Sequence, residues 1–435
     1  MTSRNLLVLK NVSLGLPLKI SGMILSYVSI PLMISLLGIE KYGVWVTLFT
    51  ILTWINTFDL GLGNGLKIKL ALALASDDLY KAKKYVSTAY LIVVIMSSVL
   101  LISGLFLGSI FDIVGYFDIE AINLDEVKTA LLVSFIFVVV NFSLALYRSI
   151  FVALNRAYIV EVCGIIFQLT FIFFILVAKY FELNSLISIA YIFGGLNFIL
   201  AITFSIYLFF QISPEIRPNF KDFEQGLVSE IFGLSSVFFI IQLSMIIILT
   251  TDNAIILKLF GPESVTLYSV PLKLFQGIIV FWSVLTTPIT VLFSDAYVKG
   301  DSQWIRKTIR KLNIIFMFLV VIVIVCVNYS EHILYLWLQK KMSFPEYLFM
   351  SFGAFVIIRV YGDLYMAFLN GIGKINLQMY LYLVGAIINI PLSVFLAISC
   401  GFGEVGVILS TCICLSLQAT VMPLQVYFIL KESTD

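Results

Sequence analysis

Charged residues are scarce in this sequence. Asp, Glu, Lys and Arg make up 12% of its 435 residues, whereas 61% are hydrophobic. A soluble domain has about a quarter of its residues charged. A water-soluble core cannot bury so much apolar surface, so a lipid bilayer must be the solvent for most of the chain. The net charge of +2 adds little, and no feature of the sequence points to nucleic acid as a partner.

The residues that many enzymes depend on are also few. The single histidine, His332, lies near the end of an apolar segment, and we interpret it as an interfacial residue. No Walker motif, metal-spaced Cys/His cluster or nucleophile–base arrangement is found, so we predict neither ATP hydrolysis by the chain itself nor a metal site. The cysteines are odd in number and lie in or beside apolar segments, which favours buried thiols over disulfides; they are Cys163, Cys326, Cys400, Cys412 and Cys414.

Long apolar segments fill the sequence instead. A membrane-spanning helix needs roughly 20 mainly apolar residues, and the polar stretches between such segments are too short here for a soluble catalytic domain. We therefore predict an all-α integral membrane protein with twelve transmembrane helices. The predicted spans are 12–37, 42–66, 85–111, 128–153, 158–180, 185–211, 230–258, 265–294, 312–338, 346–370, 375–399 and 404–430.

Two parts of the sequence share one layout. In the first, residues 58–89, an apolar span ends in a Gly-rich stretch, a basic amphipathic segment follows, and the next span begins at Tyr85. We call residues 58–89 the first elbow. Matching residues recur 223 positions downstream without a gap; the pairs are Gly38 and Gly261, Glu40 and Glu263, Asp78 and Asp301, Lys83 and Arg306, and Lys84 and Lys307. This pattern predicts an internal duplication.

The duplication predicts the domain organisation. Each half holds six predicted spans, and because six is even, both copies have the same orientation. We expect two six-helix lobes, 1–215 and 216–435, related by an axis along the membrane normal. The segment 212–228, with two prolines and mixed charge, is the expected join. Two lobes that face each other leave a cleft, which a transporter can open to alternate sides of the membrane.

The distribution of basic residues predicts the orientation of the chain. The loops on one side, together with both termini, hold 18 Lys and Arg residues, and the loops on the other side hold 6. Lys and Arg are enriched in cytoplasmic loops, so we expect both termini in the cytoplasm. The predicted outer loop 112–127 is acidic, as this orientation permits.

Basic residues inside predicted spans are the first candidates for a binding site. An ionisable side chain in the bilayer is costly, by about 2.5–3.5 kcal/mol on insertion scales, so its presence indicates function by default. Lys19, Lys273, Arg148 and Arg359 fall in or at the ends of spans and would attract an anionic headgroup such as a phosphate. Snorkelling or pairing with an acid on another helix is the alternative. Arg359 and Asp363, at i and i+4, form either a structural ion pair or a gated one.

Acidic and amide residues complete the set of candidates. Asp59, Asp252 and Asp363 are candidates for coupling transport to a proton or sodium gradient, although Asp59 could instead hold the end of its helix. Amide side chains in a cleft could form hydrogen bonds with sugars, but single residues of this kind are more often helix–helix contacts. These amide candidates are Asn141, Gln168, Gln242 and Gln276.

Several segments resemble a known family. The motif LGIEKYGVW (37–45) followed by FDLGLGNGL, the opening residues 4–20, DDLYKAKKYVSTAY (77–90), LYRSIFVALNRAYIVE (146–161) and NGIGKINLQ (370–378) resemble the Wzx-type polysaccharide flippases. These belong to the multidrug/oligosaccharidyl-lipid/polysaccharide (MOP) exporter superfamily, with MATE transporters and lipid II flippases. The resemblance extends over the whole chain, but its motifs do not specify the sugar.

The resemblance implies a function. It implies a monomeric, two-lobed flippase in a bacterial inner membrane that moves an undecaprenyl-diphosphate-linked oligosaccharide, such as an O-antigen repeat unit, to the periplasmic leaflet. A polymerase and a chain-length regulator would be its partners, with no cofactor apart from H⁺ or Na⁺ as the coupling ion. Related lipid II flippases use basic residues in helices one and eight, where Lys19 and Lys273 fall here. Lysine in place of arginine keeps the charge but lacks the bidentate fork.

Two other functions remain open. A MATE-like multidrug or cation antiporter would have an acid-rich cleft, whereas two of the intramembrane charges here are lysines, Lys19 and Lys273. A membrane polysaccharide polymerase would need a sizeable extramembrane loop with catalytic carboxylates or arginines. The longest predicted outer loop, 112–127, is too short for that role.

Overall fold

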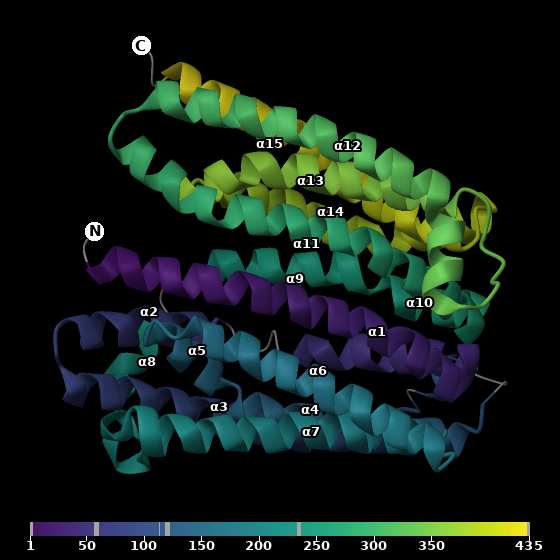
Figure 1. The fold of residues 1–435 in the computed structure, drawn as a ribbon, viewed down its shortest axis with the longest axis horizontal. Coiled ribbons are helices and arrows are strands. Elements are labelled where there is room, and N and C mark those ends of the chain that lie inside the picture. The colour runs from purple at the N-terminus through teal and green to yellow at the C-terminus, as the bar shows by residue number, and fades with distance from the viewer. Residues whose placement is uncertain (1–2, 56–60, 113, 118–121, 233–235, 433–435) are drawn as a thin grey trace. The chain divides into compact units, whose positions relative to one another are not determined.

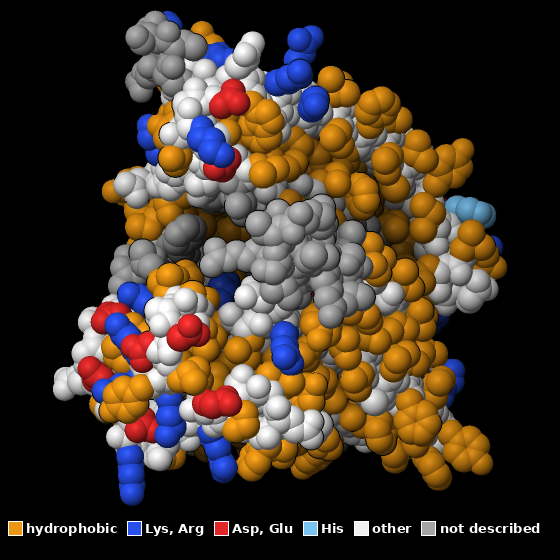
Figure 2. All heavy atoms as spheres, turned by 60° about the vertical axis from the view of Figure 1, so that its left-hand side comes forward, with side chains coloured by type: hydrophobic (Ala, Val, Ile, Leu, Met, Phe, Trp, Pro, Cys, Tyr) orange, Lys and Arg blue, Asp and Glu red, His pale blue; other side chains and the backbone are white. Residues whose placement is uncertain are grey.

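A computed structural model describes residues 3–432 apart from 56–60, 113, 118–121 and 233–235. All regular structure in the described residues is helical (Figure 1). Eleven helices in these residues are long and apolar enough to cross a membrane. Hydrophobic side chains cover much of the surface, and charged side chains gather on one side of the view in Figure 2. The predicted class, an all-α integral membrane protein, is confirmed.

The chain divides into two compact units, which we call unit 1 (Met1–Phe239) and unit 2 (Ile240–Asp435). In unit 1, α1 packs along α6 and α4 packs along α7. Its α-helices are α1 (Ser3–Thr53), α2 (Leu62–Ala75), α3 (Leu79–Ile110), α4 (Leu124–Leu144), α5 (Leu146–Ala153), α6 (Ala157–Tyr180), α7 (Leu186–Tyr207) and α8 (Gln225–Phe232). A π-helical turn, Leu208–Ile212, extends α7.

In unit 2, α13 and α15 are the most buried of the long helices, and α11 and α14 pack against them. The helices are α9 (Ser236–Thr250), which begins just before the unit boundary, α10 (Asp252–Phe260), α11 (Pro262–Val298), α12 (Ser302–Leu338), α13 (Leu348–Ile372), α14 (Asn376–Val394) and α15 (Glu404–Glu432). A π-helical turn, Phe395–Ser399, follows α14.

The first two predicted spans meet at a break within α1. Residues on either side of Gly38 form two separate helical segments, as spans 12–37 and 42–66 predicted, and the second segment ends at Thr53, short of residue 66. Gly38 has φ 81° and ψ 174°, a conformation that only glycine adopts readily. The glycine therefore changes the direction of the chain at a point where the sequence suggested a loop.

The internal repeat recurs in the backbone. Gly261, the equivalent of Gly38, has φ 86° and ψ 178° and separates α10 from α11. Asp78 and Asp301 cap α3 and α12 in the same way, since each carboxylate accepts a hydrogen bond of 2.9 Å from the amide three residues further on. Both the kink and the cap thus recur 223 residues apart, at the positions of the matching residue pairs in the sequence.

Replacing Gly261 with alanine tests the kink. A Cβ at this position would meet no atom within 4 Å, so the cost is one of backbone conformation alone. We expect Gly261→Ala to destabilise the protein by about 1–3 kcal/mol, measured as a lower thermal midpoint in detergent. Gly108→Ala is the matched control, because Gly108 lies within α3 and its added Cβ would also meet nothing. An unchanged midpoint in Gly261→Ala would contradict the requirement for glycine.

The predicted join, 212–228, packs on unit 1. Its acidic residues pair with the first elbow: Asp222 with Lys83 at 2.9 Å and Glu224 with Lys84 at 2.8 Å. On α8, Glu230 accepts a hydrogen bond of 2.6 Å from the Tyr85 hydroxyl. This bond and the nearby Lys69 lower the pKa of the Glu230 carboxyl, so the carboxylate stays charged in the folded protein. The unit boundary lies after Phe239, beyond the boundary predicted at residue 215.

Candidate functional site

Unit 1 contains a cavity of about 210 Å³ bounded by α1, α4, α5 and α7, which we call the unit-1 pocket. Aromatic rings form one wall: Phe193 lies edge-on to Phe49, with ring centroids 4.8 Å apart, and to Trp45 at 5.7 Å. The lining residues are Trp45, Phe49, Thr53, Ser134, Phe137, Val138, Asn141, Ala145, Arg148, Ala190, Phe193, Gly194 and Asn197. An apolar wall with a few polar groups is typical of ligand sites.

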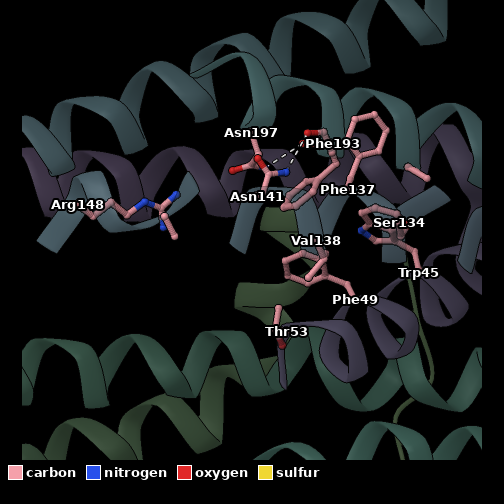
Figure 3. Close-up of a pocket in the computed structure, with 13 residues that line it drawn as sticks. Trp45, Phe49, Thr53, Ser134, Phe137, Val138, Asn141, Arg148, Phe193 and Asn197 are labelled. Atoms are coloured by element: carbon pink, nitrogen blue, oxygen red, sulfur yellow. Dashed lines mark hydrogen bonds between the residues drawn. The ribbon is translucent and has the colours of Figure 1, made fainter. Parts of the chain in front are cut away.

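Two amide side chains of the unit-1 pocket, Asn141 and Asn197, lie beside Phe137 and Phe193 (Figure 3). Asn141 donates to the Gly194 carbonyl at 3.3 Å, and its own Oδ1 has no hydrogen-bond partner among the described residues. Asn197 donates to the Phe193 carbonyl at 2.9 Å. Two amide side chains are therefore fixed by the backbone, and the Asn141 oxygen remains able to accept a hydrogen bond.

Arg148 is the charged residue of this pocket, and Figure 3 shows it at the side opposite the aromatic rings. Its Nε donates to the Tyr147 hydroxyl at 3.2 Å, and the guanidinium lies 5.7 Å from the Tyr147 ring. The lining residues include no carboxylate, and Arg148 forms no ion pair with any residue that the structure describes. The described pocket is thus cationic.

Unit 2 contains a second cavity, of about 240 Å³, which we call the unit-2 pocket. Here Arg359 forms an ion pair with Asp363 at 3.1 Å and donates to the Tyr382 hydroxyl at 3.3 Å. The side chains of Arg359 and Asp363 are 13% and 21% exposed, so the pair is largely shielded. The lining residues are Leu249, Asp252, Leu272, Gln276, Ile279, Val280, Phe355, Arg359, Ile408 and Thr411.

Asp252 is the acidic residue among those that line the unit-2 pocket, and only 4% of its surface is exposed. Its Oδ2 accepts a hydrogen bond of 2.5 Å from the Tyr268 hydroxyl, and its Oδ1 has no partner among the described residues. Beside it, the buried Asn389 contacts Thr251 at 3.4 Å and Thr411 at 3.3 Å. An isolated buried carboxylate is costly unless it is neutralised, so this position suits a proton or a bound cation.

The two pockets are related by the internal repeat. Phe49 and Thr53 are equivalent to Leu272 and Gln276, 223 positions later. In the later helices the offset becomes 218, as the starts of α7 at Leu186 and α15 at Glu404 show. At this offset the equivalent lining residues are Phe137 and Phe355, Asn141 and Arg359, Ala190 and Ile408, and Phe193 and Thr411. The same pocket therefore occurs in each unit with different chemistry: in unit 1 an arginine stands with amide and aromatic groups and no carboxylate lines the pocket, whereas in unit 2 an arginine pairs with Asp363 and the buried Asp252 lines the pocket.

The structure brings together some of the predicted site residues and separates others. Asn141 and Arg148 line the unit-1 pocket; Asp252, Gln276 and Arg359 line the unit-2 pocket, with Asp363 paired to Arg359. The remaining described candidates line neither pocket: Lys19, Gln242 and Lys273 are exposed on their own units, and Gln168 is half-buried. Asp59 lies outside the described residues.

Sequence reasoning missed most of the residues in and around these pockets, and three of them are informative. Trp45 and Asn197 line the unit-1 pocket, and Tyr268 holds Asp252. The repeat contained a signal for two of them, because Trp45 and Tyr268 lie at equivalent positions 223 residues apart. The predicted candidates were charged or amide side chains, so these aromatic residues were passed over.

Comparisons with known proteins identify the fold as that of the MATE transporters. Residues 238–395 match the MatE family model. No curated protein matches the chain in sequence.

Solved structures of this class match almost the whole chain. An inward-facing multidrug resistance MATE family transporter of the MOP superfamily has a TM-score of 0.82 at 15% identity, covering 97% of this chain and 99% of that chain. An outward-facing one has a TM-score of 0.69 at 15% identity, covering 98% and 96%. A MOP superfamily transporter from Pyrococcus furiosus, described by a reverse polarity of its binding pocket that suggests a different function, also gives 0.69 at 15%, covering 98% and 96%. At 15% sequence identity, this structural similarity shows the fold alone.

Proposed function

We propose that this protein is an alternating-access flippase for an oligosaccharide linked to a lipid diphosphate, such as an undecaprenyl-diphosphate repeat unit, in a bacterial inner membrane. The observation that carries the proposal is the chemistry of the unit-1 pocket: one arginine, two amide side chains and an aromatic wall, with no carboxylate among its lining residues. The transporter fold and the resemblance of the sequence to polysaccharide flippases support it.

Each part of the pocket suits a part of this substrate. A guanidinium binds phosphate oxygens through paired, charge-assisted hydrogen bonds, and Arg148 uses only its Nε within the described residues. Amide groups both donate to and accept from hydroxyls, and the Asn141 Oδ1, which has no partner among the described residues, can accept such a hydrogen bond. The cavity, about 210 Å³, is smaller than the roughly 300–1,000 Å³ of drug-sized sites, so it would receive part of an oligosaccharide at a time.

The unit-2 pocket supplies a coupling site in this proposal. Moving a diphosphate outward requires work, and a proton or sodium gradient can provide it where an acid changes its state during the cycle. Asp252 is the best-placed of the candidate acids, because one of its oxygens has no partner among the described residues. Asp363 is already neutralised by Arg359. Lys19 and Lys273, exposed on their units, stay as proposed contacts for the diphosphate.

A MATE-like antiporter of drugs or cations is the second candidate. The buried Asp252 favours it, because an acid can bind a cationic substrate as readily as a coupling ion. The match to the MatE family model over residues 238–395, which include Asp252, also favours the antiporter. The cationic unit-1 pocket favours an anionic substrate instead, and one relative of the same fold is described as having a binding pocket of reverse polarity.

Deletion of the gene distinguishes the candidates. For a flippase, surface polysaccharide should disappear and lipid-linked repeat units should accumulate on the cytoplasmic face of the inner membrane. Both are measured by mass spectrometry of lipid extracts, with surface labelling of vesicles of each orientation. Unchanged polysaccharide with new drug sensitivity would reject the flippase and favour the antiporter. Repeat units that reach the outer face but stay unpolymerised would indicate a polymerase.

A further inference from the structure

The two copies of the repeat differ in what covers the start of α3 in unit 1 and the start of α12 in unit 2. In unit 1, residues 83, 84, 87 and 88 in the first turns of α3 bind the segment 219–224 through ion pairs and hydrogen bonds. Lys83 and Lys84 form ion pairs with Asp222 and Glu224 at 2.9 and 2.8 Å. One turn later, Ser87 accepts a hydrogen bond of 3.0 Å from the amide of residue 219, and Thr88 accepts one of 3.2 Å from the amide of residue 224.

In unit 2, the equivalent positions on α12 are all basic. Arg306, Lys307, Arg310 and Lys311 lie 223 residues after the four positions of α3. We call these four residues the α12 basic cluster. All four are exposed, and none forms an ion pair with a residue that the structure describes. Arg306 donates to the Leu430 carbonyl, at the end of α15, at 2.5 Å. Four positive charges thus lie within two helical turns, and none has a described carboxylate partner.

The helix face that carries this cluster continues as an apolar surface. Lys307 and Lys311 are followed at spacings of three and four residues by Ile314, Phe318, Val321 and Val325, which are 53%, 69%, 59% and 50% exposed. Residues at this spacing share one side of a helix. Figure 2 shows basic side chains gathered where α12 begins, next to a surface of hydrophobic side chains.

The length of α12 places the cluster at the membrane surface. Its 37 residues extend about 55 Å, whereas the hydrocarbon core of a bilayer is about 30 Å thick. The apolar residues from Ile314 onward suit the core, so the first turns, with Arg306 and Lys307, reach the headgroup layer.

We propose that the α12 basic cluster is a binding site for the headgroups of anionic phospholipids in the leaflet that the start of α12 meets. Basic residues near an anionic membrane surface each contribute about 1 kcal/mol to binding. The exposed face from Ile314 to Val325 would contact the acyl chains of the same lipids. Unit 1 shows that an acidic peptide segment can occupy these positions. The lipid is favoured in unit 2 because the described residues place no acidic side chain on these four positions, whereas in unit 1 Asp222 and Glu224 already neutralise them. This inference does not depend on which substrate is transported.

Native mass spectrometry of the full-length protein tests the site. The delipidated protein, in mild detergent, is titrated with phosphatidylglycerol and separately with phosphatidylcholine. We expect the wild type to retain phosphatidylglycerol preferentially and to lose that preference as salt is raised. Replacing all four residues, R306Q/K307Q/R310Q/K311Q, should weaken phosphatidylglycerol binding by about fivefold for each charge that contributes, and should leave phosphatidylcholine binding unchanged.

The repeat provides a matched control. K83Q/K84Q removes two charges at the equivalent positions of unit 1, which the segment 219–224 already neutralises, so its phosphatidylglycerol binding should change less than that of R306Q/K307Q. Should the fourfold variant fail to fold, K307Q/K311Q keeps the Arg306 contact with α15 and gives the same comparison with two charges. Wild-type phosphatidylglycerol binding in folded cluster variants would overturn the proposal. Cross-linking of the cluster to an acidic protein in native membranes, with no lipid preference, would overturn it in favour of a protein partner.

Discussion

Arg148→Ala is expected to lower export of the lipid-linked oligosaccharide by about 10- to 100-fold while leaving folded protein in the membrane. Arg148 is the charged residue lining the unit-1 pocket, and it has no described carboxylate to leave unpaired when it is removed. A hydrogen bond to a charged group is worth about 1.5–3 kcal/mol, which corresponds to this loss if the guanidinium holds the diphosphate. The readout is surface polysaccharide, together with repeat units retained on the cytoplasmic face.

The control variants separate charge from geometry. Arg148→Lys keeps the charge without the planar fork, so it should restore part of the export. Arg156→Ala removes an arginine from the nearby turn between α5 and α6, outside the pocket, and should export normally. Normal surface polysaccharide in Arg148→Ala, at wild-type protein levels, would remove Arg148 from the site. Lost export with equal loss in Arg148→Lys would indicate that the fork is essential.

The repeated features could be predicted from the sequence because their causes are local. A glycine is needed wherever the chain adopts the conformation of Gly38 and Gly261, and an aspartate caps a helix through its own nearby amides, as Asp78 and Asp301 do. Such features depend on a few consecutive residues. Two copies at one spacing therefore identified the duplication before any tertiary contact was known.

The pockets could be predicted only in part, because depth in a membrane does not tell which way a side chain faces. The spanning helices are apolar on nearly all sides, so they lack the one-sided pattern that marks the inner face of a soluble helix. Lys19 and Lys273 were correctly noted as charges in spans, yet each lies on an exposed face of its unit. The partnership of Asp252 with Tyr268 crosses the break at Gly261, so helical spacing could not reveal it.

Asp252→Asn tests the coupling site, and we expect it to uncouple transport from the ion gradient. Asparagine keeps the size of the side chain and can still accept the hydrogen bond from Tyr268, but it can neither take up a proton nor balance the charge of a sodium ion. The rate of oligosaccharide flipping in everted vesicles should therefore depend on pH or sodium in the wild type. In the variant the rate should be low and nearly independent of both.

Two further variants decide how that result is interpreted. Tyr268→Phe removes the 2.5 Å hydrogen bond but keeps the carboxylate, so transport should stay coupled while its pH or sodium dependence shifts. Asp295→Asn removes an exposed acid of α11 that pairs with Lys299, and its transport should match the wild type. If Asp252→Asn keeps the wild-type dependence, Asp252 does not couple transport, and a different acid must respond to the gradient.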